Sequence, residues 1–251
     1  MILRRPDHQW PLLVASNRDE KTNRPWRSPG RHWQDRPEVV AGIDELGNGT
    51  WLGVNDYGVM AAVTNRKNTL GNDPRLRSRG ELVLEALDHP DALDAIDAIL
   101  DVEPAAYRGF NFLVADNRDA WWVRSTGPDA AKVEAFEIPE GISIITSGGA
   151  NELNSARTRF YLPKFERATI PNPEKGDWSS WEELLQSTDI EAGAGSEEAM
   201  LISPRDGYGT VSSSLIALGT PFTGTPKVIW RFSGEPGRPG SFQDIDLGAK
   251  I

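Results

Sequence analysis

The feature that most constrains this chain is an apolar run near its N-terminus that ends in strongly polar residues. Pro11 to Ala15 follows a break at Pro6-Asp7 and has the length and composition of a buried β-strand. Asn17-Arg18-Asp19-Glu20 then places an amide, a base and two acids at the mouth of that strand, at one point. Chemistry alone favours a solvated turn with an Arg–carboxylate pair, so a functional interpretation depends on the rest of the chain.

The composition excludes several classes of partner. The chain has 251 residues, enough for a sizeable core, and a formal net charge of −10. Nucleic acids and anionic membrane surfaces attract clustered Lys and Arg, so neither is expected as a partner. The sequence contains no cysteine, which excludes disulfides and thiolate metal sites within it. No stretch is apolar enough for a membrane span or a signal peptide, and we expect a cytoplasmic protein.

The sequence from Ile2 to Thr64 predicts mainly β-strands and turns. Ile2 to Arg5 and Pro11 to Ala15 predict a hairpin, whereas Arg24 to Pro37 contains several prolines and predicts an irregular excursion. Three apolar runs separated by Gly- and Asn-containing turns predict a β-meander. These runs are Val39 to Ile43, Thr50 to Val54 and Val59 to Thr64.

Helices and strands then alternate in blocks. Ser78 and Glu81 have the spacing of a capping box for a helix to Leu87, and Pro90 suits the first turn of a helix over Asp91 to Leu100. Strands are predicted to follow at Phe110 to Ala115, Ala120 to Arg124, Lys132 to Ile138 and Ile142 to Thr146.

The last third predicts two helices and a final hairpin. A helix begins at Asn154 or Ser155, is interrupted at Pro163 and ends near Arg167. A short helix is predicted over Trp181 to Leu185, with Ser179 or Ser180 as its cap. The last predicted strands are Gly209 to Leu218 and Lys227 to Phe232, which form a hairpin across Gly219 to Pro226. No linker divides the chain, so we predict one α+β domain over residues 1–251, with an irregular tail from about Gly234.

Several motifs occur in a fixed order along the chain. They are Asn17 to Glu20, Gly49 to Asn55, Gly58 to Asn65, Ser78 to Leu82, Gly109 to Leu113 and Tyr208 to Ser214. The first of these, Asn-Arg-Asp-Glu, is the signature that names the NRDE family, the relatives of transport and Golgi organisation protein two. The other motifs also resemble that family's patterns, and the resemblance runs from the first strand to about Leu218.

The resemblance implies the fold of the N-terminal-nucleophile hydrolases, a four-layer αββα sandwich. In such enzymes a terminal cysteine attacks an amide, an acid holds its α-amine and an amide side chain stabilises the oxyanion. By motif position Asp19 would hold the amine with Asn17 beside it, and Asn65 would donate to the oxyanion. Asn151 is a weaker candidate for a second amide.

The chain departs from the enzyme pattern at the nucleophile. Family members open with Met-Cys-Thr, whereas this chain opens with Met1-Ile2-Leu3, and Val211 stands where relatives often have Arg. Enzymatic activity is therefore an open question. One alternative is that the chain is an N-terminal-nucleophile amidohydrolase whose true start, with the cysteine, lies upstream. The other is that it is a binding protein with a hydrolase fold.

The resemblance also implies a binding function, because the family is associated with haem trafficking. We expect a non-catalytic protein that binds or carries a hydrophobic small molecule such as haem, with no required cofactor and no metal site. The candidate ligand-binding residues are Arg18, Trp51, Asn151, His32 and Trp33. His32 lies between two tryptophans in the proline-rich segment and is a candidate axial ligand, although a surface position is the simpler interpretation. A structural interaction protein is the third alternative, and it predicts no pocket near Asn17, Asp19 and Asn65.

Overall fold

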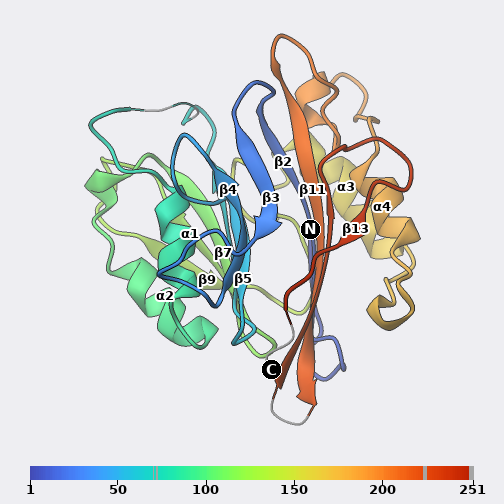
Figure 1. The fold of residues 1–251 in the computed structure, drawn as a ribbon. Helices are drawn as coiled ribbons and strands as arrows, with labels where there is room; N and C mark the ends of the chain where they lie inside the picture. The colour runs from blue at the N-terminus through green and yellow to red at the C-terminus, as the bar shows by residue number, and fades with distance from the viewer. Residues whose placement is uncertain (70, 72, 223–224, 249–251) are drawn as a thin grey trace.

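The computed structural model describes residues 1–69, 71, 73–222 and 225–248. Two antiparallel sheets form its centre (Figure 1). The first sheet has the strand order β10 (Gly141–Ser143), β1 (Ile2–Arg4), β2 (Leu12–Lys21), β11 (Tyr208–Phe222), β12 (Thr225–Ser233) and β13 (Gln243–Asp244). The second has the order β3 (Trp26–Gly30), β4 (Val39–Asp44), β5 (Leu52–Asn55), β6 (Met60–Asn65), β7 (Phe110–Ala115), β8 (Ala120–Ser125) and β9 (Glu134–Glu137).

Helices cover the outer face of each sheet (Figure 1). The second sheet is covered by α1 (Gly80–Leu87) and α2 (Ala92–Leu100), and the first by α3 (Ala156–Arg167) and α4 (Ser179–Leu185). Short 3₁₀ helices occupy Pro104–Ala106, Pro173–Lys175 and Ser196–Glu198. No helix in the described part of the chain is both long enough and apolar enough to cross a membrane.

Three apolar layers hold this sandwich together. One lies between α1, α2 and the second sheet, one between the two sheets, and one between the first sheet and α3 and α4. Tryptophan anchors two of these layers: the fully buried Trp10, Trp178 and Trp181 lie between the first sheet and its helices, and Trp230 lies between the sheets. The layer order is the predicted αββα sandwich, which confirms the expected fold class.

The long strand β2 shows how the layers are separated. Side chains alternate across a strand, so Leu13 and Ala15 pack in the helical layer while Leu12 and Val14 pack between the sheets. Pairing with β11 joins residues almost 200 positions apart, such as Thr210 and Asp19. The register shifts between Thr210 and Ser212, which places Val211 at a β-bulge.

Local structure differs from the predictions at three helices. Glu81 does not close a capping box: its carboxylate accepts from the Tyr107 hydroxyl at 2.6 Å, and Arg79 is the N-cap of α1. Trp178, not a serine, precedes α4. The helix α3 begins after Ser155 as predicted but continues through Pro163, because Tyr161 and Phe165 anchor it to the core on both sides of the proline.

Two strands lie where none was predicted. β3 occupies part of the segment Arg24 to Pro37 that was expected to be irregular, and Pro29 is tolerated because β3 is an edge strand paired only with β4. The tail after Gly234 contributes β13, which pairs with β12. Residues 223 and 224 of the predicted turn Gly219 to Pro226 lie outside the described residues, as do residues 249–251 of the tail.

Candidate functional site

A large cleft opens where the two sheets meet beyond the apolar layer between them. Its volume is about 1270 Å³. Apolar side chains from both sheets line one part of it, including Val14, Leu52, Met60, Ala62 and Leu113. Its charged lining consists of Arg18, Arg24, Arg66, Lys67, Arg77, Arg79, Arg108 and Arg157 together with Asp19, Glu20, Asp44, Asp73, Glu152, Glu197 and Glu198. The lining is therefore close to balanced in charge, although the whole chain carries −10.

Strand alternation divides the Asn-Arg-Asp-Glu segment between two layers. Asn17 and Asp19 continue the helix-facing side of β2, whereas Arg18 reaches across to the second sheet. The four residues were expected to supply donors, acceptors and charge at one point. The structure places the segment within β2, not after the strand, so neighbouring side chains point to opposite faces, although all four residues line the cleft.

Arg18 forms the link between the sheets. Its Nη2 lies 3.1 Å from Asp44 Oδ2 at the end of β4, and its guanidinium carbon lies 4.2 Å from the centre of the Trp51 ring. The Arg18 side chain is only 8% exposed. Burial lowers the pKa of the guanidinium, and the nearby Asp44 and Glu20 oppose that shift.

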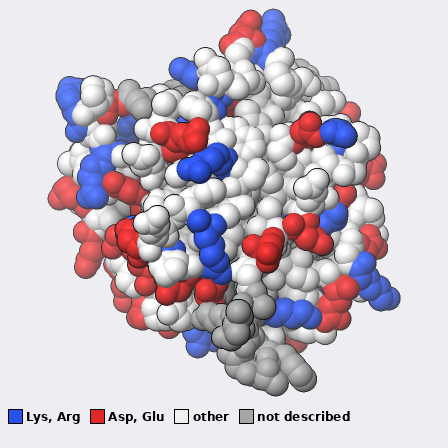
Figure 2. All heavy atoms as spheres, viewed as in Figure 1, with Lys and Arg blue, Asp and Glu red and all other residues white. Residues whose placement is uncertain are grey.

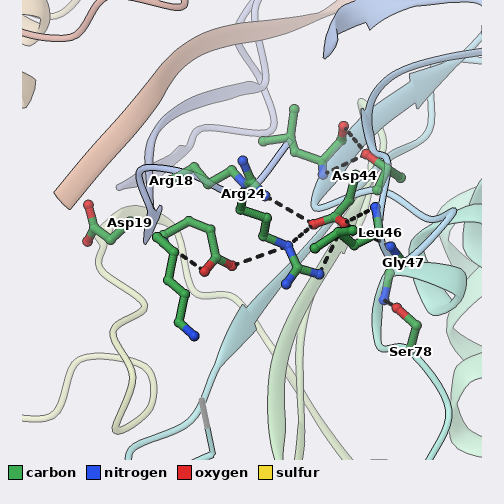
Figure 3. A network of polar contacts seen from close by, with 12 residues as sticks. Arg18, Asp19, Arg24, Asp44, Leu46, Gly47 and Ser78 are labelled. Carbon is green, nitrogen blue, oxygen red and sulfur yellow. Dashed lines mark hydrogen bonds and ion pairs between the residues drawn. The ribbon is translucent and has the colours of Figure 1, made fainter. Parts of the chain in front are cut away.

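Asp44 is the centre of a polar network (Figure 3). Besides Arg18 it accepts two hydrogen bonds from Arg24, at 2.5 and 3.0 Å, and two from the backbone N–H groups of Leu46 and Gly47, at 3.1 and 2.9 Å. The hydrogen bond to Asp44 raises the pKa of Arg24. In Figure 3 the Asp19 carboxylate lies apart from this network and points away from it.

Trp51 forms the aromatic wall of the site. Its ring packs edge-on against Trp26, with centroids 5.8 Å apart, and lies directly over Gly42. A Cβ atom at Gly42 would lie 2.3 Å from the ring, so glycine is required at that position to leave room for it. Gly42 therefore leaves room for the Trp51 ring, which forms a flat apolar surface beneath Arg18.

Asn17 and Asp19 are engaged on the other face of β2. Asn17 Nδ2 donates to the carbonyls of Leu185 and Met200 at 2.9 and 2.7 Å, and its Oδ1 accepts from the Ser213 hydroxyl at 2.6 Å. Asp19 accepts from Thr210 Oγ1 at 2.6 Å and lies 3.5 Å from Arg157. Both residues line the cleft, as does Met1, whose α-amine donates to Ala15 O at 2.7 Å.

Asn65 lies at the end of β6 and also lines the cleft. The next residue, Arg66, donates to Asn111 Oδ1 at 2.7 Å, and Asn111 is fully buried. Asn111 Nδ2 in turn donates to Thr146 O at 2.8 Å. Asn17, Arg18, Asp19, Trp51 and Asn65 therefore border one cleft, as the motif order implied.

The structure separates the other predicted residues from this cleft. Asn151 supports the loop after β10, where its Oδ1 accepts from Ile144 N at 2.8 Å and its Nδ2 donates to Ser143 Oγ at 3.1 Å. The His32 ring contacts Ser28 O at 2.8 Å, and Trp33 packs beside α1 and α2. None of these three residues is among those that line the cleft.

Apart from Arg18, sequence reasoning missed the basic residues of the cleft, and it also missed Asp44, the acid partner of Arg18. Arg79 Nη1 donates to Thr69 Oγ1 and Gly109 O at 3.0 and 2.9 Å. Burial, followed by the charge of Arg108, lowers the pKa of Arg79 to about 10. The motif Ser78-Arg79-Gly80-Glu81 contained this residue, and a lone Arg beside a predicted helix start was its only signal. Asp44 directly follows a predicted strand, which is the signal that could have found it.

Charges elsewhere on the surface are mixed. On the face drawn in Figure 2, Lys and Arg side chains are interspersed with Asp and Glu around an uncharged central area. This face shows no broad basic area of the kind that a nucleic acid requires.

Comparison with solved structures defines the class of fold. The fold is similar to a Caenorhabditis elegans N-acylethanolamine-hydrolyzing acid amidase ortholog, with a TM-score of 0.54, 12% sequence identity, and coverage of 96% of this chain and 93% of that one. The chain therefore has an N-terminal-nucleophile-hydrolase-like fold.

Sequence comparison then defines the family. The family model of Transport and Golgi organisation 2 matches residues 1–221, and the chain belongs to that family. The bovine transport and Golgi organization protein 2 homolog is 40% identical over 113 residues, and the human homolog is 38% identical over 109 residues. Each match spans 42% of this chain and only 38% of the length of the relative.

Proposed function

We propose that this protein binds or carries a hydrophobic small molecule, such as haem, in the cleft between its two sheets, without chemical turnover. The observation that carries this proposal is the cleft itself, with a volume of about 1270 Å³ and an apolar lining from both sheets. Ligand pockets typically measure roughly 300–1000 Å³ and combine apolar walls with a few polar groups that orient the ligand.

The residues of the cleft are compatible with haem as cargo. Trp51, which lies beneath Arg18, contributes aromatic surface to the wall of the cleft, and the arginines offer partners to acidic substituents. None of the three histidines of the chain lines the cleft. Binding would therefore depend on apolar and ionic contacts without a histidine axial ligand, which suits a carrier that must release its cargo.

A haem titration tests this proposal. We expect a saturable shift of the Soret band with the wild-type protein, and about fivefold weaker binding for Trp51→Ala, because an aromatic contact worth on the order of 1 kcal/mol is lost. Trp33→Ala is the matched control, since Trp33 lies outside the cleft lining. A titration that stays linear, like haem in buffer, would contradict the proposal.

An amidohydrolase is the second candidate, favoured by the position of Asp19 and Asn65 in one cleft. Hydrolysis by the mechanism of this class needs a terminal nucleophile, and the given sequence contains no cysteine. The intact mass and N-terminal sequence of the protein from its native cell separate the two candidates. A mature terminus that begins with cysteine upstream of Ile2 favours hydrolysis, and Asp19→Ala should then abolish turnover of an amide substrate.

A structural interaction protein is less consistent with these observations. That alternative predicts no pocket near Asn17, Asp19 and Asn65, whereas all three residues line the cleft.

A further inference from the structure

One donor of Arg18 has no acceptor within the described part of the chain. Arg18 Nη2 contacts Asp44, but Nη1 is buried and makes no hydrogen bond to any described residue. The side chain is more than nine-tenths buried and lines the cleft. A buried charged donor without an acceptor is costly, so a ligand atom that accepts from it gains a strong interaction.

The charge around Arg18 is only partly neutralised. Asp44 is shared between Arg18 and Arg24, at 3.1 and 2.5 Å. Glu20 Oε2 lies 3.8 Å from Arg24, while its Oε1 accepts from the backbone N–H of Lys21. Three guanidinium groups, those of Arg18, Arg24 and Arg79, therefore face two carboxylates in this part of the cleft.

Arg79 adds to this excess, and within the described residues it forms no ion pair with an acidic side chain. Its hydrogen bonds go to a hydroxyl and a carbonyl, both uncharged acceptors. The charges of Arg24 and Glu20 influence it, which places it within electrostatic reach of the Arg18 network. The local surplus of positive charge contrasts with the net charge of −10 for the chain.

Apolar side chains continue the cleft beyond this basic wall. Val14 comes from the first sheet, and Leu52, Met60, Ala62 and Leu113 come from the second. A ligand that contacts both regions must combine an anionic end with an apolar body, because each part is stabilised only by its own wall.

We infer that the cleft recognises an oxyanion group, a carboxylate or a phosphate, carried on an apolar body, with Arg18 Nη1 as the principal donor and Arg79 as the second cation. This inference rests on the proposed binding function and specifies the chemical class of its ligand. Burial lowers the pKa values of Arg18 and Arg79, and a bound anion would offset the cost of their charged forms.

A comparison of three matched probes tests the inference without any mutation. The probes are a dansyl-labelled long-chain carboxylic acid, the phosphate monoester of the same chain, and the uncharged methyl ester of the acid. We expect the ester to bind at least about tenfold more weakly than the better of the two anions, because charge-assisted hydrogen bonds are lost. The tighter of the two anions identifies the head group.

Variants then assign the preference to its residue. Arg18→Met keeps an apolar side chain over Trp51 but removes the charge. It should bring the ratio of anion affinity to ester affinity close to one, while the affinity for the ester changes little. Arg79→Met should lower the ratio less. The control is Arg27→Met, since the exposed Arg27 pairs with Glu45 outside the cleft.

The outcomes separate this inference from the proposed function. Equal binding of acid, phosphate and ester by the wild-type protein would overturn the anion inference and leave a purely apolar pocket. An unchanged ratio in both Arg18→Met and Arg79→Met would also overturn it. Absence of saturable binding for all three probes would also overturn the anion inference, whereas the proposed binding function is overturned only if the haem titration stays linear as well.

Discussion

At the scale of single residues, neighbours in the Asn-Arg-Asp-Glu segment have separate tasks. Asn17 ties β2 to the carbonyls of Leu185 in α4 and of Met200, and to the Ser213 hydroxyl on β11, whereas Arg18 spans the space between the sheets. Within this segment, Asn17 therefore stabilises the fold and Arg18 contributes to the cleft. The alternation of a β-strand explains this division.

Asn17 should be important for stability. Asn17→Ala leaves the Leu185 and Met200 carbonyls without their donor and the Ser213 hydroxyl without its acceptor. We expect a loss of about 2–3 kcal/mol in the free energy of unfolding, measured by urea denaturation. Asn23→Ala, at an exposed position, is the control. Equal stability of the two variants would show that these hydrogen bonds contribute little.

Asp119 should make stability depend on pH. Burial, and then the charge of Asp116, raises the pKa of Asp119 in the folded state. The folded state therefore holds this proton more tightly than the unfolded state, so the contribution of Asp119 is most favourable below about pH 4 and is lost as the pH rises through the folded pKa. Asp119→Asn should gain stability relative to wild type between acid and neutral pH in urea denaturation. A difference that is constant with pH would contradict this assignment.

At the scale of elements, close backbone contact positions α1 on the second sheet. Thr50 N donates to Gly80 O at 3.1 Å, so the turn before β5 touches the first turn of α1. A Cβ atom at Gly49 would lie 2.5 Å from the carbonyl carbon of Gly80. The turn Gly47-Asn48-Gly49 is therefore required for helix packing as well as for the hairpin.

Gly49→Ala should force α1 away from the sheet. The added methyl group meets backbone rather than a flexible side chain, so we expect a loss of about 2 kcal/mol or more in the free energy of unfolding. Gly30→Ala is the matched control, because its nearest neighbour would be the His32 ring at 3.5 Å. If thermal unfolding shows the same midpoint for both variants, α1 is free to adjust.

At the scale of the whole molecule, the Asp44 network couples the two sheets beside the cleft. Arg18 belongs to the first sheet and Asp44 to the second, and Arg24 lies in the connection between β2 and β3. The contact is well shielded, with side chains 8% and 15% exposed. It therefore holds the cleft walls in a fixed relation.

A double-mutant cycle should detect this coupling. Asp44→Ala alone should cost about 3 kcal/mol, because Arg18 is left as a buried charge without its partner. The cycle Arg18→Met with Asp44→Ala should give a coupling energy above about 1 kcal/mol in urea denaturation. Arg27 and Glu45 form the control pair, whose exposure of 56% and 43% predicts a coupling well below that value. Equal coupling in the two pairs would mean that the Arg18 contact is also weak.

The sequence by itself determined the strands of the meander, most of the helices and the α+β class, because apolar periodicity and turn residues act over a few neighbouring positions. The αββα sandwich was implied by the resemblance to the NRDE family. The same resemblance implied that Asn17, Asp19 and Asn65 share one site, and Arg18 and Trp51 were predicted as ligand-binding residues. Only the tertiary structure decided that β3 pairs at an edge, that α3 continues through Pro163, and that Asn151, His32 and Trp33 lie outside the cleft. The Arg18 site depends on the contact of β2 with Asp44 across the sandwich and on burial of one guanidinium N–H. Such contacts join residues far apart in the chain, and their energies depend on packing and desolvation that no local pattern encodes.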